Sequence, residues 1–239
     1  MTDESPSPTE IDPRLRRIID DGIAHAKVAI AQYQDRATNN LVRCTRLLKL
    51  YEVLRANMPP SIHADLEDVL RATVVLMHAS VEDFLRVIAE ARLPLAEPEV
   101  LDKVPFSVKG ATSEKIQLGF LARHRGKSVN EVIEQVVRDH LARTSFSSTS
   151  DIVSVLTRLG LDAKQIEVHL PDLDAMIRRR HQIVHNADLV TGGAPPLAPI
   201  GYEDVQQWIH TSTMFMIDVL SMLGVDAVRQ KWLASADAN

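Results

Sequence analysis

The chain has 239 residues, of which 45% are hydrophobic and 4% aromatic, so it is long enough to bury a sizeable core. Its formal net charge of −5 excludes a general attraction to nucleic acid, and any such surface must gather its basic residues locally. The single cysteine, Cys44, excludes an internal disulfide. The sequence shows no signal peptide and no apolar run of about 18 residues. Together with the single cysteine, this predicts a cytoplasmic protein without a membrane-spanning helix.

The N-terminal quarter of the chain predicts a tail followed by long helices. Residues 1–12 (MTDESPSPTEID) are polar and contain prolines, so we expect them to be disordered. Pro13 suits the first position of a helix, and apolar residues then follow helical spacing as far as Leu54. The pattern predicts one helix, or two with a break near Thr38 to Asn40. Its basic residues could line an RNA track, although a solvated helix face is the favoured interpretation.

A second helix follows a proline turn at 58–61 (MPPS). Ser61 or Asp65 can cap it, and it is predicted to reach about Leu93. Its apolar residues recur every three or four positions and predict a face turned to the core. His78, which lies within this stripe, is interpreted as a core or edge histidine.

Residues 94–150 are predicted to be a connector plus an inserted helical hairpin inside a single domain spanning 13–239. Prolines and a glycine mark the connector, and a helix is expected from Thr112 or Ser113 to about His124. Ser128 and Glu131 form a capping-box pattern for a second helix that ends near Thr144. An alternative is that 104–144, with its VPFSV segment, resembles a ribbon-helix-helix DNA-binding unit. That segment is short and alternates weakly.

The remaining elements are also helical, so the predicted fold class is all-α. The loop at 144–150 (TSFSSTS) can cap a helix that begins at Asp151 and stops at Gly160. A helix then runs from about Leu170 towards Asp188, and a final one is predicted over 202–223. Its methionine-rich stripe is interpreted as core or dimer contact. Residues from Ala234 onwards are expected to fray.

The stretch at 174–188 (DAMIRRRHQIVHNAD) places charge on an apolar helix face. Its helical spacing predicts a face turned to the core, formed by Leu170, Leu173, Ile177 and Val184. Arg180 falls in the middle of this face. An arginine keeps its proton, so Arg180 needs an anionic partner, a partner subunit or a solvent-filled cleft. Glu82 or Asp83 of the earlier helix is a candidate partner, although either is equally an ordinary surface acid.

His185 lies about 140° around an ideal helix from Arg180. The two side chains therefore share a face only if the helix loosens or ends there. Asn186, Asp188 and the loop at 191–199 (TGGAPPLAP) predict that it ends. The negative end of the helix dipole then favours protonated His181 and His185.

The sequence RHQIVHN at 180–186 resembles the signature of the HEPN superfamily: arginine, a polar residue, three apolar or variable residues and histidine. The stretch at 71–86 is similar to the first core helix of such domains, and 126–162 resembles the RiboL-PSP-HEPN subgroup. The resemblance covers about two thirds of the chain. It implies an antiparallel helical bundle, homodimerisation and RNA cleavage without metal or cofactor. It also implies that Arg180 and His185 are catalytic and that His181 fills the polar position.

In the implied reaction the ribose 2′-hydroxyl attacks the adjacent phosphate. His185 exchanges protons, Arg180 stabilises the phosphorane, and His181 orients the substrate or takes the second proton role. Arg179 and Asn186 are expected to bind substrate, and Asn186 could also fix an imidazole tautomer. Two copies across a two-fold axis would supply both acid and base. The family also suggests toxin or phage-defence biology, with an antitoxin or other regulatory partner.

Three other interpretations remain open at this stretch. His181 and His185 have the four-residue spacing of a zinc-binding pair, although no third ligand is evident and Arg180 would repel a cation. A basic helix end that only hydrogen-bonds to loop carbonyls is a purely structural reading. A non-catalytic RNA-binding or scaffolding HEPN protein is the third.

Overall fold

The computed structural model describes residues 13–104, 118–189 and 197–224. These residues form helices and connecting turns, and their β-type pairing is limited to an isolated bridge between Leu189 and Leu197. The prediction of an all-α fold is confirmed. The expected tail at 1–12 and the fraying end from Ala234 lie outside the described residues. No helix in the described ranges is both long enough and apolar enough to cross a membrane.

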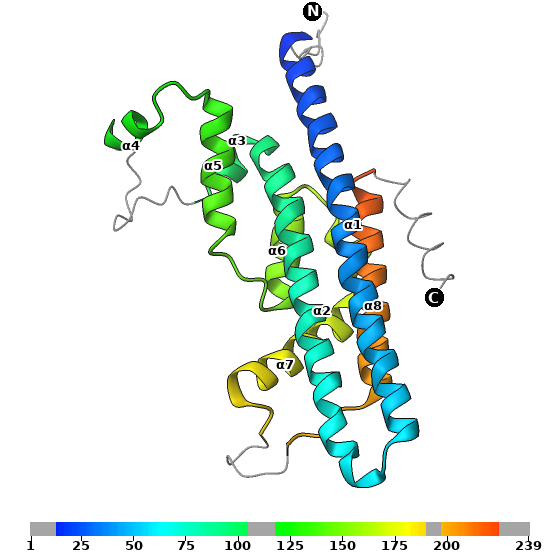
Figure 1. The fold of residues 1–239 in the computed structure, drawn as a ribbon. Coiled ribbons are helices and arrows are strands. Elements are labelled where there is room, and N and C mark those ends of the chain that lie inside the picture. Colours follow the sequence, from blue (N-terminus) through cyan, green and yellow to red (C-terminus); the bar gives the residue numbers. More distant parts are fainter. Residues whose placement is uncertain (1–12, 105–117, 190–196, 225–239) are drawn as a thin grey trace, which may run out of the picture.

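Two long antiparallel helices form the spine of the bundle, α1 (Pro13–Asn57) and α2 (His63–Arg92) (Figure 1). α1 is continuous for 45 residues, so the alternative of a break near Thr38 to Asn40 is wrong. The predicted caps of α2 are also wrong. A 3-10 turn, η1 (Pro60–Ile62), precedes α2, so Ser61 lies inside that turn and Ile62 takes the N-cap position.

The core is centred on α2, which contacts α1, α5, α6, α7 and α8. Its predicted apolar stripe is buried, and Phe84 meets Phe215 of α8 (Tyr202–Met222) edge to face at 6.4 Å between ring centroids. α8 has the predicted bounds to within one residue. Cys44 is fully buried in α1, and burial raises the pKa of its thiol to about 12, so it is a packing residue.

The segment after α2 contains η2 (Leu93–Leu95), α3 (Pro98–Leu101), α4 (Leu118–Arg123) and α5 (Val129–Leu141). The predicted capping box is confirmed: Ser128 Oγ accepts from Glu131 N, and Glu131 Oε2 accepts from Ser128 N at 2.6 Å. α5 stops at Leu141, before the expected Thr144, and Arg86 of α2 donates to the carbonyls of Leu141 and Thr144. The short segment of the ribbon-helix-helix alternative, apart from Val104, lies outside the described residues.

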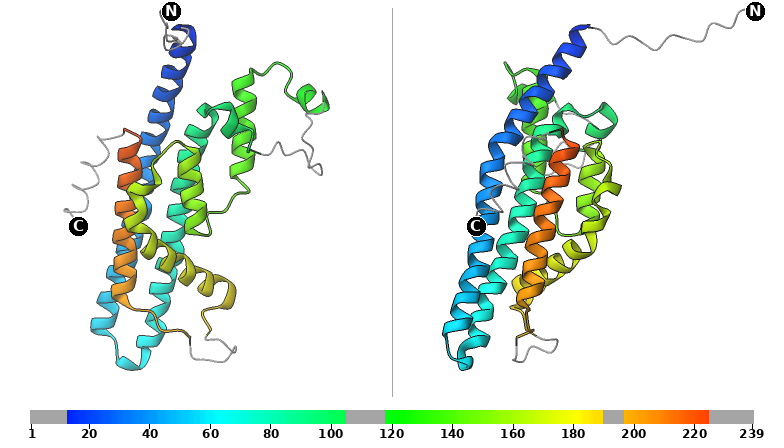
Figure 2. Two further views of the ribbon diagram at one scale, coloured as in Figure 1. Left: turned by 180° about the vertical axis from the view of Figure 1, so that it is seen from behind. Right: turned by 90° about the vertical axis from the view of Figure 1, so that its right-hand side faces the viewer.

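α6 (Thr149–Arg158) and α7 (Leu170–Asn186) pack on α2, and η3 (Ala163–His169) between them packs on α8. Ser148 caps α6, so the helix begins two residues before the expected Asp151. It ends at the predicted glycine, because Gly160 has a φ of +72° and allows a tight reversal. α7 runs obliquely to the spine, and its C-terminal end projects from the bundle (Figures 1 and 2).

Candidate functional site at the end of α7

The first half of α7 is anchored on the core and on α8. Leu173, Met176 and Ile177 are buried, as the apolar pattern predicts. Asp172 in the first turn accepts hydrogen bonds from Gln207 Nε2 at 2.9 Å and Thr211 Oγ1 at 2.8 Å. These two donors lower the pKa of Asp172. This half of the helix is therefore fixed by both apolar and polar contacts.

The last turns of α7 leave the core. Val184, predicted to lie on the core face, is 46% exposed because the helix has run past the edge of the bundle by that point. The predicted helix end is confirmed, since Ala187 and Asp188 adopt left-handed φ values of 49° and 58°. The backbone N–H groups of both residues donate to Gln182 O, which closes the helix.

A network that we call the Asp188 clasp holds this end in place; it consists of Arg71, Arg179, Asp188 and the Ala198 carbonyl. Asp188 is 1% exposed, and its Oδ2 accepts from Arg71 Nε at 2.5 Å and from Arg179 Nη2 at 2.7 Å. Both arginines also donate to Ala198 O at 2.8 Å. The clasp thus joins α2, the end of α7 and the segment before α8.

The clasp is electrostatically balanced. Burial alone would lower the pKa of Arg71, but the hydrogen bond and the charge of Asp188 raise it, with Glu67 and Asp68 adding to the effect. The pKa of Arg179 is lowered by burial, against the attraction of Asp188. The structure therefore gives Arg179 a structural role, and its predicted contact with substrate stays a prediction. The sequence offered no signal for the link to Arg71, which lies 117 residues from Asp188.

On the other side of the same helix end lies a group that we call the Arg180 cluster: Arg180, His181 and His185 of α7, with His78 and Glu82 of α2. The rings of His181 and His185 meet at right angles with 5.5 Å between centroids. Arg180 Nε and His181 Nε2 are shielded from solvent and have no hydrogen-bond partner among the described residues. Polar atoms in that condition are rare in folded proteins and call for an explanation.

The expected carboxylate partner of Arg180 is not found. Within the described ranges, no carboxylate oxygen lies within 4 Å of its guanidinium. Asp83 pairs instead with Arg36 at 3.0 Å. Glu82 Oε1 accepts the backbone N–H of Phe146 at 3.0 Å. The charge of Arg180 is therefore left for a ligand, a partner subunit or water to balance.

His78 connects this cluster to the core. It is 2% exposed, as expected for a core histidine, but its Nε2 has no partner in the described part of the chain. Its Nδ1 lies 3.7 Å from Glu82 Oε2. Burial lowers the pKa of His78, Glu82 opposes this, and the positive charges of Arg180 and His181 lower it further. His78 is therefore a neutral imidazole at neutral pH, and the charges of Arg180 and His181 on α7 act on it.

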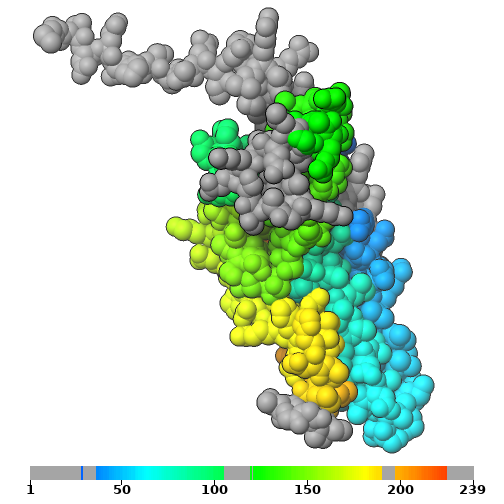
Figure 3. Space-filling view, turned by 90° about the vertical axis from the view of Figure 1, so that its left-hand side faces the viewer, coloured from blue at the N-terminus to red at the C-terminus, as the bar shows by residue number. Residues whose placement is uncertain are grey.

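His185 and Asn186 are both exposed, at the outer end of the cluster. The α7 segment at the surface beside α2 is visible in Figure 3 (yellow against cyan). Because the helix is intact from Arg180 to His185, these two side chains point in different directions within one chain. His181 lies between them in sequence and meets the His185 ring. No described residue accepts or donates a hydrogen bond at the Asn186 side chain, so the structure offers no support for its fixing a tautomer.

The described residues around the end of α7 do not form a complete ligand set for a metal ion. Across residues 13–104, 118–189 and 197–224, no group of three or more His, Cys, Asp or Glu side chains is placed to hold a metal ion. His181 and His185 keep the spacing of a zinc pair, but this part of the chain brings no third such ligand to them.

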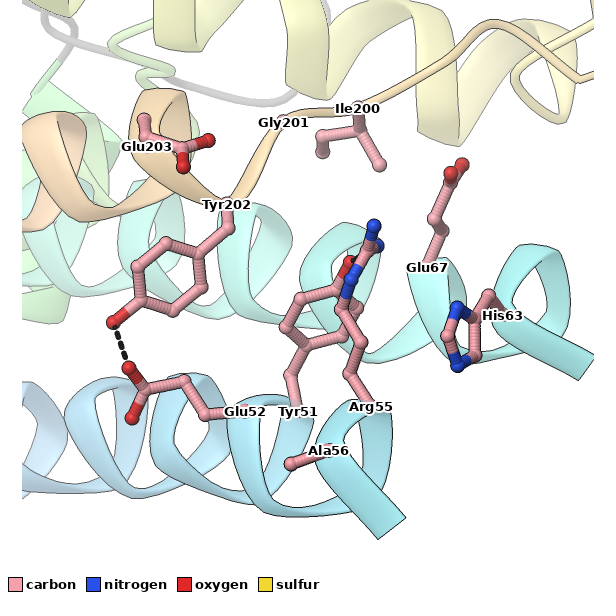
Figure 4. Close-up of a pocket in the computed structure, with 10 residues that line it drawn as sticks. All are labelled: Tyr51, Glu52, Arg55, Ala56, His63, Glu67, Ile200, Gly201, Tyr202 and Glu203. Atoms are coloured by element: carbon pink, nitrogen blue, oxygen red, sulfur yellow. Dashed lines mark hydrogen bonds between the residues drawn. The ribbon is translucent and has the colours of Figure 1, made fainter. Parts of the chain in front are cut away.

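A pocket of about 770 Å³ lies elsewhere, between the α1–α2 turn and the start of α8 (Figure 4). Tyr51 and Tyr202 stack along it at 6.1 Å, and Tyr202 Oη donates to Glu52 Oε1 at 2.8 Å. Its charged lining consists of Glu52, Glu67, Glu203, Arg55 and the titratable His63. Three carboxylates beside one arginine disfavour a phosphate, so this pocket is not the site for a nucleic-acid backbone.

No protein-family model, curated protein or solved structure matches the chain. The resemblance to the HEPN superfamily therefore rests on the residues quoted from the sequence, and the contacts of the Arg180 cluster are the structural observations that bear on function.

Proposed function

We propose that the protein is a metal-independent endoribonuclease of the HEPN type, with its site in the Arg180 cluster. The observation that carries the proposal is a guanidinium and two imidazoles at the projecting end of α7, with no carboxylate of the described residues paired to the guanidinium. A permanently charged arginine fork suits phosphate oxygens. Histidine is the side chain that exchanges protons near neutral pH. Together they match the needs of RNA cleavage by internal transfer.

In this reaction the ribose 2′-oxygen attacks phosphorus, so a P–O2′ bond forms and the P–O5′ bond breaks. One histidine takes the proton of the 2′-hydroxyl, and another protonates the departing 5′-oxygen. Arg180 stabilises the charge that builds up on the phosphorane. The products are a 2′,3′-cyclic phosphate and a 5′-hydroxyl. His185 is assigned to proton transfer, and His181 to substrate orientation or to the second proton.

Homodimerisation completes the site in this proposal. Because Arg180 and His185 diverge on one intact helix, a two-fold axis near the end of α7 would bring Arg180 opposite His185 of the partner subunit. The exposed Val184, with Leu197 across the adjoining loop, supplies apolar surface at this end of the molecule. The antitoxin or regulatory partner and the toxin or defence role remain proposals that rest on the family resemblance alone.

The proposal is tested by incubating the purified protein with a mixed RNA pool, with and without EDTA, and by analysing the product ends. We expect cleavage that survives EDTA and leaves 2′,3′-cyclic phosphates. Arg180→Ala and His185→Ala should each lower the rate by about 100-fold or more. Arg178→Ala is the matched control, because Arg178 is exposed on the same helix and pairs only with Asp174 in the described structure.

Three outcomes separate the alternatives. Activity lost to EDTA and restored by zinc would support a metal site at His181 and His185. RNA binding without cleavage, weakened by Arg180→Ala, would support a non-catalytic RNA-binding protein. Absence of both cleavage and binding at any protein concentration that supports dimerisation would overturn the proposed function.

A further inference from the structure

We propose that the pocket between the α1–α2 turn and the start of α8 binds a small zwitterion of the amino-acid class, with its carboxylate on Arg55 and its ammonium group on Glu203 (Figure 4). None of the described residues that line this pocket belongs to the Arg180 cluster. The ligand site is therefore independent of the proposed ribonuclease function and adds recognition of a small molecule to it.

Two tyrosines form a wall of the pocket. Tyr51 of α1 and Tyr202 of α8 stack at 6.1 Å between ring centroids, with 19° between their planes. Tyr202 Oη donates to Glu52 Oε1 at 2.8 Å, and Tyr51 Oη accepts from Arg55 Nη1 at 2.6 Å. Burial and the neighbouring Glu52 raise the pKa of Tyr202 to about 12, so its hydroxyl stays a donor at neutral pH. These contacts join α1 to α8 without a ligand, so the wall is formed in advance.

Two of the three carboxylates in the lining already have cationic partners. Glu52 pairs with Lys49 at 2.9 Å, and Glu67 pairs with Arg71 at 3.2 Å. The pocket is therefore largely balanced in charge, although its carboxylates still disfavour a ligand that carries only negative charge.

One cation and one anion of the lining remain without an ion pair. Among the described residues, no carboxylate oxygen lies within 4 Å of the Arg55 guanidinium, and no cationic nitrogen lies within 4 Å of the Glu203 carboxylate. Arg55 rises from the last turn of α1 and points towards Ile200, while Glu203 extends from the first turn of α8 (Figure 4). The pocket thus offers a positive and a negative group on two different helices.

The ligand that matches both groups carries both charges. The planar Arg55 guanidinium can donate two parallel hydrogen bonds to a carboxylate, and Glu203 can accept from an ammonium group. A phosphate brings no positive charge for the carboxylates, and a simple amine leaves Arg55 without an anion. Ile200, Ala56 and the half-buried Tyr202 supply apolar surface for a side chain. A volume of about 770 Å³ holds an amino acid with a large side chain.

Isothermal titration calorimetry on the full-length protein at neutral pH tests the inference with three matched probes: phenylalanine, phenethylamine and 3-phenylpropionate. The second compound is phenylalanine without its carboxyl group, and the third is phenylalanine without its amino group. We expect phenylalanine to bind at least about 10-fold more tightly than either, because each fragment forms only one of the two charged contacts. Binding is measured without RNA, so the result does not depend on ribonuclease activity.

Two variants assign the ends of the ligand. Arg55→Gln and Glu203→Gln should each weaken the binding of phenylalanine by about 10-fold or more. Arg55→Gln should not weaken the binding of phenethylamine, and Glu203→Gln should not weaken that of 3-phenylpropionate. Arg46→Gln is the matched control, because Arg46 is exposed on α1 but does not line the pocket. Circular dichroism should show that all three variants keep the helical content of the wild type.

Several outcomes would overturn the inference. One is that phenylalanine fails to bind the wild-type protein at about 10 mM, since a ligand of this size that meets both charges should reach millimolar affinity. Another is that either fragment binds the wild type as tightly as phenylalanine, which would show that one charge is enough. Unchanged phenylalanine affinity in Arg55→Gln or Glu203→Gln would place the ligand elsewhere. An equal loss in Arg46→Gln would show that affinity follows the overall charge of α1.

Discussion

Arg179 and Arg180 are adjacent on one helix, and both lie where α7 meets α2, yet their surroundings differ completely. Both terminal nitrogens of Arg179 donate hydrogen bonds, although its Nε stays unpaired. The described residues offer the Arg180 side chain no hydrogen bond and no carboxylate within 4 Å. One arginine closes the Asp188 clasp, and the other lies in a cluster of imidazoles.

A charge that stabilises the fold can be distinguished by its partners from one that is available to a ligand. A buried cation that is paired with an anion and with carbonyl acceptors stabilises the fold. Removing it leaves those acceptors buried without a donor. A shielded cation with no carboxylate within 4 Å among the described residues is instead available to an anion from another molecule. The clasp fixes the end of α7, the helix that carries Arg180, His181 and His185.

The largest expected effect is at the clasp. Asp188→Asn keeps a side chain that tolerates the left-handed φ of 58° but removes the charge shared by Arg71 and Arg179. We expect a loss of about 3–5 kcal/mol in the free energy of unfolding, since Arg179 loses its carboxylate and Arg71 keeps only the more exposed Glu67 and Asp68, each at 3.2 Å. Chemical denaturation measures it.

Asp174→Asn is the control for that experiment. Asp174 pairs with Arg178 on the same helix, but both side chains are exposed, at 38% and 73%. An exposed ion pair contributes at most about 1 kcal/mol. Equal losses in the two variants would show that the clasp stabilises the fold no more than a surface ion pair does.

The next effect compares the two arginines directly. Arg179→Met should lower the free energy of unfolding by about 3 kcal/mol, because it breaks a buried pair and leaves acceptors unfilled. Arg180→Met should change it by less than about 1 kcal/mol while abolishing cleavage. Thermal unfolding and the RNA assay on the same preparations measure both. A strongly destabilised Arg180→Met would mean that Arg180 is structural as well.

A smaller effect depends on pH. The pKa of His78 is lowered on folding, chiefly by burial, so the unfolded chain binds its proton more readily. Its contribution to stability is therefore complete above the ordinary histidine pKa of 6.5 and is lost as the pH falls below it. Between about pH 7 and pH 5 the wild type should lose more stability than His78→Leu. Burial also lowers the pKa of His140. Because the wild type and His78→Leu both contain this residue, its contribution cancels in the comparison.

The smallest effect concerns the link between the two regions. Ala187 lies between His185 and Asp188 with a φ of 49°, which costs an alanine about 1–2 kcal/mol. Ala187→Gly relieves that cost but increases the freedom of the unfolded chain, so we expect a gain of about 0.5 kcal/mol. Differential scanning calorimetry should show a slightly higher Tm. A lower Tm would indicate that the alanine methyl makes a stabilising contact at this helix end.

The sequence predicted the helical elements well where local chemistry sets them. The capping box of Ser128 and Glu131 marks the start of a helix, and Gly160 marks the end of another. Both are local signals, and the structure confirms both. Val184 was assigned wrongly to the core because periodicity describes a face of a helix and cannot say where the bundle beneath it ends. The start of α2 was missed because two consecutive prolines impose a 3-10 turn before the helix.

The candidate site divides in the same way. The residue pattern alone predicts that a guanidinium and two imidazoles gather within six residues at a helix end, because spacing on one helix fixes their relation. The packing of helices that are distant in sequence sets the other relations: Asp188 accepts from both Arg71 and Arg179, Asp83 pairs with Arg36, and Glu82 accepts the backbone N–H of Phe146. Those relations join residues that lie 9 to 117 positions apart in the chain. They depend on how α2 packs against its neighbours, which no local pattern encodes.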